Sequence, residues 1–133
     1  LARVLGHPAE DRFQCDAPIS DAPGELGTRG IDLEAGLPAR TEFRVIRRSA
    51  DGTTLIEARP VTGRTNQIRV HLWQMNLPIL GDAVYLPGRQ LGGTQTLGPD
   101  DPPLCLHSAE IEFKHPLTGH SVSFSAPSPV WWE

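Results

Sequence analysis

Residues 59–72 read Arg-Pro-Val-Thr-Gly-Arg-Thr-Asn-Gln-Ile-Arg-Val-His-Leu, and residues 77–82 read Leu-Pro-Ile-Leu-Gly-Asp. The first stretch predicts a strand end, a tight turn at Gly63 and a helix, because Gly permits the positive φ that such turns use. The unpaired N–H groups at the start of that helix would attract an anion near Arg64 and Arg69. A rigid element of this kind can hold an arginine in one position within a pocket.

A hairpin is expected immediately before this turn, over residues 41–48 and 53–59. Phe43 and Val45 alternate with charged residues in its first strand. The tetrapeptide at 49–52 ends in Asp-Gly, which is a strong signal for the turn of a β-hairpin. The sequence therefore predicts two long antiparallel strands leading into the helix.

The helix itself is predicted over residues 65–75, with Thr65 as its N-terminal cap. Helical spacing predicts a buried stripe made by Ile68, Leu72 and Met75. Arg69 and Trp73 are one turn apart and are expected to share a different face.

The remaining strands are shorter and are separated by loops rich in Gly and Pro. We expect strands at 1–5, 13–19, 104–113 and 121–125, with Val122 and Phe124 pointing inward, and loops at 20–36 and 87–103. About six strands, one main helix and two long loops predict an α+β fold with a largely antiparallel mixed sheet. The two tryptophans at 131 and 132 are expected to close the chain against the core.

Length and charge limit the classes of function. At 133 residues the chain is one domain or part of one, and its net charge of −4 argues against indiscriminate binding to nucleic acid. However, seven of the 12 basic residues lie between positions 40 and 69. This clustering indicates either a local RNA-facing patch or a solvated arginine-rich hairpin.

The expected environment is a soluble, cytoplasmic one without a membrane partner. No apolar run approaches the roughly 20 residues of a membrane span, and no basic-then-apolar leader opens the chain. Two cysteines, Cys15 and Cys105, are too few for a disulfide framework and are expected to be ordinary thiols.

Residues 59–72 and 77–82, followed by Tyr85, closely resemble the signature of the RluA-type RNA pseudouridine synthases. One position departs from it, since Asn66 stands where the family usually has His. Residues 106–109 (Leu-His-Ser-Ala) and 113–119 (Phe-Lys-His-Pro-Leu-Thr-Gly) are similar to the family's C-terminal pattern. The resemblance thus extends over nearly the whole chain.

The resemblance implies isomerisation of uridine to pseudouridine in rRNA or tRNA, without cofactor or metal. It assigns Arg69 to the catalytic site, where the family's arginine pairs with the catalytic aspartate and orients it. The positions next to Arg69 in the motif imply contacts with RNA. The predicted RNA-binding residues are Arg64, Asn66, Gln67 and Trp73, the last through stacking on a base.

Two landmarks of the family do not occur in the sequence. The catalytic aspartate belongs to a His-Arg-Leu-Asp loop, which the chain lacks, and the active-site tyrosine would fall immediately before residue 1. We therefore expect residues 1–133 to be the C-terminal portion of a synthase domain, inactive alone and prone to self-association through an open sheet edge. Asp82 is expected to brace a turn, and Tyr85 to be structural.

The residues raise three other candidate functions. A zinc site could use Cys105, His107, His115 and His120, but their spacing is loose. A serine hydrolase is disfavoured because no Gly-x-Ser-x-Gly motif occurs. A related module that binds RNA without catalysis is the main alternative to an isomerase.

Overall fold

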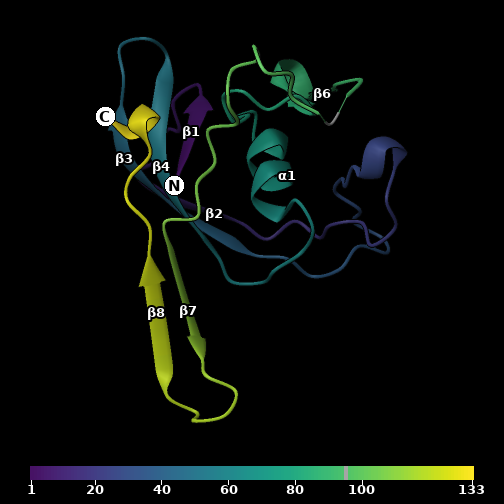
Figure 1. Ribbon diagram of the computed structural model, residues 1–133. Coiled ribbons are helices and arrows are strands. Elements are labelled where there is room, and N and C mark those ends of the chain that lie inside the picture. Colours follow the sequence, from purple (N-terminus) through teal and green to yellow (C-terminus); the bar gives the residue numbers. More distant parts are fainter. Residues whose placement is uncertain (95) are drawn as a thin grey trace.

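The computed structural model describes residues 1–94 and 96–133 (Figure 1). Its strands are β1 (Ala2–Leu5), β2 (Arg12–Cys15), β3 (Thr41–Arg48), β4 (Thr53–Pro60), β5 (Tyr85–Leu86), β6 (Gln90–Leu91), β7 (Glu110–Lys114) and β8 (Ser121–Ser125). One α-helix, α1 (Gln67–Gln74), accompanies three short 3-10 turns, η1 (Glu25–Gly27), η2 (Pro87–Arg89) and η3 (Val130–Trp132). The predicted α+β class is confirmed.

The main sheet is antiparallel and has the strand order β1-β4-β3-β2. The predicted hairpin forms its centre as β3 and β4, and Gly52 takes φ +83° in the connecting turn. The register of this hairpin shifts between Val45 and Arg47, which marks a β-bulge. The other described strands form two separate two-stranded sheets, β5-β6 and β7-β8.

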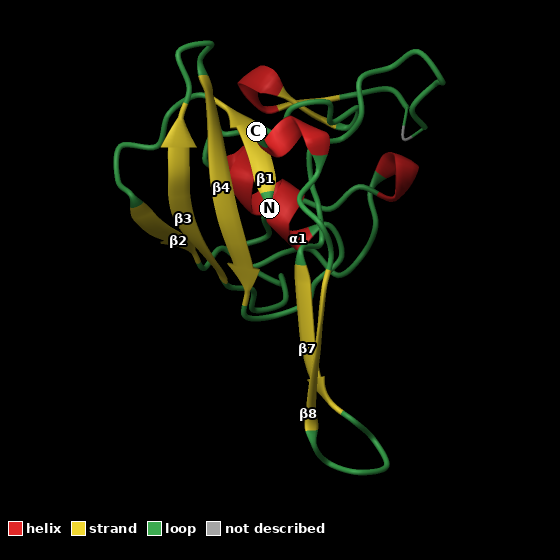
Figure 2. Cartoon of the chain, turned by 60° about the vertical axis from the view of Figure 1, so that its left-hand side comes forward, coloured by secondary structure: helices red, strands yellow, loops and turns green. Residues whose placement is uncertain are grey.

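Helix α1 lies against one face of the main sheet (Figure 2). The core between them is a cluster of apolar side chains contributed by the sheet, the helix and the segments that follow the helix. Its buried members are Ala2, Val4, Phe43, Ile56, Leu72, Leu77, Ile79 and Cys105. The other face of the sheet, which we call the outer face, points away from α1.

The helix differs from its prediction in start and in burial. It begins at Gln67 with Asn66 as its N-cap, and no side chain caps it, so the prediction that Thr65 does so is wrong. Its buried residues are Gln67, Val70, His71 and Leu72, while Ile68 and Met75 are only partly buried. The reason is that α1 is covered on two sides, by the sheet and by a second cluster around Ile19 and Tyr85. In the described part of the chain, no helix has the length and apolar character needed to cross a membrane.

Two predicted strands are shorter than expected. The strand predicted at 13–19 ends at Cys15, and Ile19 instead makes single bridges to Ile31 and Leu37. The strand predicted at 104–113 is regular only over β7, with one bridge between Leu106 and Ala2. The expected loop at 87–103 contains η2 and β6, and its residue 95 lies outside the described residues.

Hairpin β7–β8 projects from the body of the molecule (Figures 1 and 2). Its apolar side chains are therefore exposed: Ile111 by 55%, Phe113 by 42% and Phe124 by 58%. The prediction that Phe124 points inward is wrong, because no part of the described chain covers this hairpin; Phe124 stacks only on Phe113, with ring centroids 6.1 Å apart. Trp131 does pack on the core, as expected.

Candidate functional site

The signature stretch builds a buried ion pair between Arg69 of α1 and Asp82. Arg69 Nε and Nη2 each donate to one carboxylate oxygen of Asp82, both at 2.8 Å. Asp82 is placed by Gly81, which has φ +78° and passes so close to Pro103 that an added Cβ would lie 2.1 Å from its carbonyl oxygen. Only glycine fits at position 81, so the Leu-Gly-Asp sequence fixes where the carboxylate lies.

Asp82 also braces the turn that follows it, as expected. Its Oδ1 accepts hydrogen bonds from the backbone N–H groups of Val84 at 2.9 Å and Tyr85 at 3.0 Å. Burial alone would raise the pKa of the Asp82 carboxyl, but the hydrogen bonds from Arg69, Tyr85 and Val84 outweigh it and lower the pKa. The carboxylate is thus ionised, and its bond to Arg69 raises the pKa of the guanidinium.

Arg69 keeps part of its hydrogen-bonding capacity. A guanidinium has five N–H donors; two of them bind Asp82, and a third, on Nη1, binds Asn66 Oδ1 at 3.2 Å. The remaining two have no partner among the described residues. The guanidinium carbon lies 4.9 Å from the ring centre of Tyr85, which fixes the plane of the group. A second carboxylate could therefore bind an arginine that is already oriented.

Asn66 has a backbone role as well as a side-chain one. It adopts the left-handed conformation, with φ 57°, immediately before α1. Gly63 does not have a positive φ, and a Cβ there would meet no atom within 4 Å, so the expectation that Gly63 makes the tight turn is wrong. Asn is among the few residues other than Gly that adopt this conformation readily.

Tyr85 joins several parts of the site and is fully buried. Its hydroxyl accepts hydrogen bonds from Arg29 N at 2.8 Å and from Asn66 Nδ2 at 3.3 Å, and it donates to Arg29 O at 3.1 Å. The Trp73 ring meets the Tyr85 ring edge-on at 5.5 Å. Arg69 and Trp73 thus share a face, as predicted, and that face is the one that packs on Tyr85.

Gln67 is buried and holds the turn together. Its Nε2 donates to Arg40 O at 2.8 Å and to Thr41 Oγ1 at 3.0 Å. Its Oε1 accepts from Thr62 Oγ1 at 2.7 Å and from Arg64 N at 3.0 Å. Both ends of the amide are engaged inside the protein, which is the geometry of a residue that positions the loop.

His71 is a further polar residue of this network, and no sequence pattern indicated it. It is fully buried, with Nε2 2.9 Å from Ala17 O and Nδ1 2.8 Å from Thr41 Oγ1. A carbonyl oxygen only accepts, so Nε2 carries the proton and Nδ1 accepts from the threonine hydroxyl. Burial lowers the pKa of His71, which keeps the ring neutral. Helical spacing gave no sign of this, because it identifies apolar faces only.

The predicted site residues fall into two groups. Arg69, Asn66 and Trp73 surround Tyr85, whereas Gln67 and Arg64 lie at the turn before α1, where Arg64 Nε donates to Pro38 O at 2.9 Å. The pairing of Arg69 with Asp82 was not predicted, although both residues belong to the quoted motif. The contacts of Arg64, Asn66, Gln67 and Trp73 with RNA stay predictions.

A pocket of about 580 Å³ opens beside Ile68, between the end of β4 and residues 106–110. His107 is among its lining residues, and its Nε2 is buried with no hydrogen-bond partner in the described part of the chain. Within residues 1–94 and 96–133, no group of three or more His, Cys, Asp or Glu side chains could hold a metal ion.

Comparison with known proteins identifies the family. Residues 1–74 match the family model described as RNA pseudouridylate synthase, and this match covers more than half of the chain. The chain belongs to the RNA pseudouridylate synthase family. Within the family it is of the RluA type: it is 36% identical over 126 residues to the dual-specificity RNA pseudouridine synthase RluA of Pasteurella multocida.

The relatives and solved structures that match this chain are longer than it is. The protein of the same name from Escherichia coli K12 is 36% identical over 129 residues, which are 96% of this chain and 55% of that protein; for the Pasteurella protein the shares are 95% and 54%. The structure of human RNA pseudouridylate synthase domain containing 1 has a TM-score of 0.73 at 24% identity and covers 96% of this chain and 53% of that one. The chain spans about half the length of the curated relatives it matches.

Proposed function

We propose that the chain is the arginine-bearing half of an RNA pseudouridine synthase domain and that Arg69 orients the catalytic aspartate. The observation that carries this proposal is the state of Arg69: Asp82 and Tyr85 fix its guanidinium, and two of its N–H donors have no partner among the described residues. A carboxylate bound to those donors would be held ionised and in one orientation. The carboxylate in this proposal is the aspartate of the His-Arg-Leu-Asp loop that the resemblance to the family implies.

The reaction explains why orientation matters. Pseudouridine formation breaks the bond between uracil N1 and the ribose, turns the base, and joins the ribose to C5, which then loses its proton. An aspartate that acts in this sequence has to meet the target uridine at one position and angle, and misplacement by about 1 Å is enough to lose on the order of 100-fold in rate. Arg69 would act through the aspartate, as a positioning residue.

The neighbouring residues receive different roles in this proposal. Arg64 would hold the RNA backbone, and Trp73 would stack on a base with the part of its ring that Tyr85 leaves uncovered. Asn66 would support Arg69 in place of the family's usual His, and Gln67 would position the turn from inside the protein. The substrate would be rRNA or tRNA in the cytoplasm, in keeping with the dual-specificity RNA synthases among the relatives.

The test uses a chimaera in which a segment of a relative carrying His-Arg-Leu-Asp and the active-site tyrosine precedes Leu1. Tritium release from RNA containing 5-tritiated uridine measures turnover, and fluorescence anisotropy measures RNA binding. Arg69→Ala is expected to reduce turnover by about 100-fold or more while the Kd changes by less than about tenfold. Equal losses in both would contradict an orienting role. They would make Arg69 an RNA-binding residue instead.

A further inference from the structure

The outer face of the main sheet gathers arginines because of the β-bulge in β3. Side chains alternate along a strand, so a regular β3 would place Arg47 on the helix side with Phe43 and Val45. The bulge adds one residue at Ile46, after which Arg47 pairs with Leu55 while Arg44 pairs with Glu57. Leu55 and Glu57 lie two apart on β4 and share a face, so Arg44 and Arg47 also share the outer face. Bulges often serve to redirect a side chain at a functional position.

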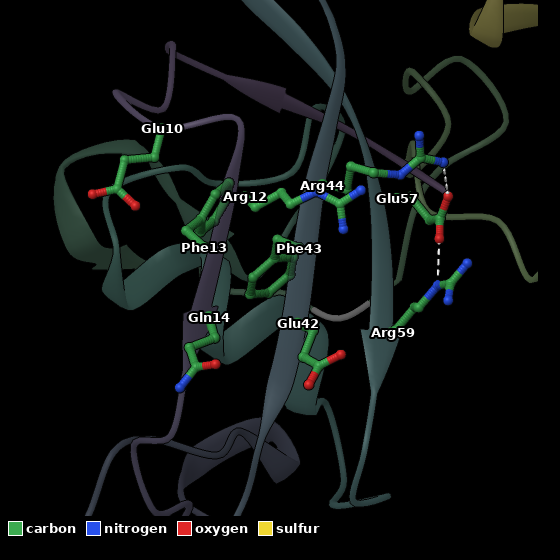
Figure 3. A pocket seen from close by; sticks show the side chains of 9 residues that line it. All are labelled: Glu10, Arg12, Phe13, Gln14, Glu42, Phe43, Arg44, Glu57 and Arg59. Carbon is green, nitrogen blue, oxygen red and sulfur yellow. Dashed lines mark hydrogen bonds and ion pairs between the residues drawn. The ribbon is translucent and has the colours of Figure 1, made fainter.

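The neighbouring strand β2 adds a third arginine at the same place. Arg12 is directly opposite Arg44 in the antiparallel register. Figure 3 shows the Arg12 side chain reaching across β3 toward Arg44. Like charges directly opposite each other destabilise a sheet, and the ion pair of Arg44 with Glu57 offsets only the Arg44 charge.

The acids nearby leave Arg12 and Arg47 uncompensated. Glu57 binds both Arg44 and Arg59, and Asp11 binds Arg48 at 2.7 Å. Neither Arg12 nor Arg47 has a side-chain partner among the described residues. A shallow groove of about 380 Å³ at the bulge is lined by four arginines, one acid and two apolar residues: Arg12, Arg44, Arg47, Arg48, Asp11, Val45 and Ile46. In a chain of net charge −4, this is a strong local excess of positive charge.

We propose that Arg12, Arg44 and Arg47 bind the phosphodiester backbone of RNA on the outer face, as a second contact surface across the sheet from α1. The planar guanidinium group suits paired hydrogen bonds to phosphate oxygens. A second groove, of about 740 Å³, continues from Arg12 and Arg44 to Arg59 near the end of β4, and Glu10, Glu42 and Glu57 also line it (Figure 3). The chain then turns at residues 61–66 into α1, so a bound strand can follow the β3–β4 hairpin toward Arg64. The inference rests on the proposed function for the choice of RNA as the anion.

The test compares two double variants of the 133-residue chain that remove the same charge. Arg12→Ala with Arg47→Ala removes the two uncompensated arginines, and Arg89→Ala with Lys114→Ala removes two exposed basic residues away from the outer face. Binding of a fluorescein-labelled RNA stem-loop is measured between about 50 and about 200 mM salt. Thermal melting confirms that both variants fold.

The first variant is expected to bind more weakly and to lose about 0.7 to 0.9 from the slope of log Kd against log salt for each arginine removed. The control is expected to keep the slope of the unchanged chain. Equal slopes in the two variants would overturn this inference while leaving the proposed function intact. If the unchanged chain binds no RNA at all, the inference also fails. The proposed function is then tested separately by tritium release from the chimaera.

Discussion

Asp82 is the only carboxylate with a fully buried side chain among the ion pairs of the described residues, and its partner Arg69 is 21% exposed. Removing one member of a buried pair leaves an unpaired charge, which costs about 3–5 kcal/mol. We expect Asp82→Ala to lower the free energy of unfolding by about 3 kcal/mol, toward the lower limit because water reaches part of Arg69. Urea denaturation measures the loss.

A matched control is the exposed pair of Arg48 and Asp11, in which Asp11 is 80% exposed. Asp11→Ala is expected to change the unfolding free energy by less than about 1 kcal/mol. If the two aspartate variants had the same free energy of unfolding, the pair between Arg69 and Asp82 would not stabilise the fold more than the exposed pair does.

The buried ring of His71 makes stability depend on pH. Its pKa is lowered in the folded state, so below about pH 6.5 the unfolded chain binds more protons at this residue than the folded one. The contribution of His71 is complete above about pH 6.5 and is lost as the pH falls toward the lower folded pKa. We expect unfolding free energy to fall by at most about 1.4 kcal/mol per pH unit in this window.

His71→Gln is the variant that isolates this dependence. It cannot titrate, so its stability should be lower at pH 7 but should vary less between about pH 6.5 and 5. Urea denaturation across this range supplies both curves. Parallel curves for the two proteins would show that another group causes the pH dependence.

Sequence reasoning at the residue scale succeeded where the signal is local or belongs to the motif. Asp82 was expected to brace its turn because an aspartate after glycine commonly binds the next backbone N–H groups. Its pairing with Arg69, 13 positions away, depends on how the loop at Gly81 packs on Pro103. No periodicity encodes such a contact.

At the scale of elements, strand β3 carries a cluster of arginines, and one of them repels an arginine on the neighbouring strand. Its residue Arg44 faces Arg12 of β2, and like charges in this position cost about 0.2–1 kcal/mol. Arg12→Thr is expected to raise the thermal midpoint, more at low salt than at high salt, because it removes the repulsion and introduces a β-branched residue. Differential scanning calorimetry at two salt concentrations checks this.

Arg47→Thr is the control for that change, because Arg47 pairs with the apolar Leu55. It should show little salt-dependent gain. A salt-dependent gain of the same size in both variants would indicate a general effect of net charge.

The elements themselves were predicted with uneven success, for physical reasons. The β3–β4 hairpin was predicted correctly because alternation and an Asp-Gly turn are local signals. The position of helix α1 was predicted well, but its buried face was not. Gln67 and His71 can lie on that face because they make hydrogen bonds to Thr41 and to backbone groups. The bulge between Val45 and Arg47 has no signature that alternation alone could reveal.

At the scale of the whole molecule, hairpin β7–β8 exposes apolar surface that the described chain does not cover. We expect sedimentation velocity to show concentration-dependent self-association of the 133-residue chain, driven by Ile111, Phe113 and Phe124. Phe113→Ser with Phe124→Ser should reduce it. Leu33→Ser, at an isolated residue that is 81% exposed, should not. Unchanged association in the double variant would place the contact elsewhere.

The central claim is that this chain supplies an oriented arginine to a pseudouridine synthase whose aspartate lies on another segment. The most direct measurement is tritium release from RNA containing 5-tritiated uridine, by the chain alone and by the chimaera that adds the aspartate-bearing segment. We predict release by the chimaera and none by the chain alone. Release by the chain alone, or none from a chimaera that folds cooperatively and binds RNA, would contradict the claim.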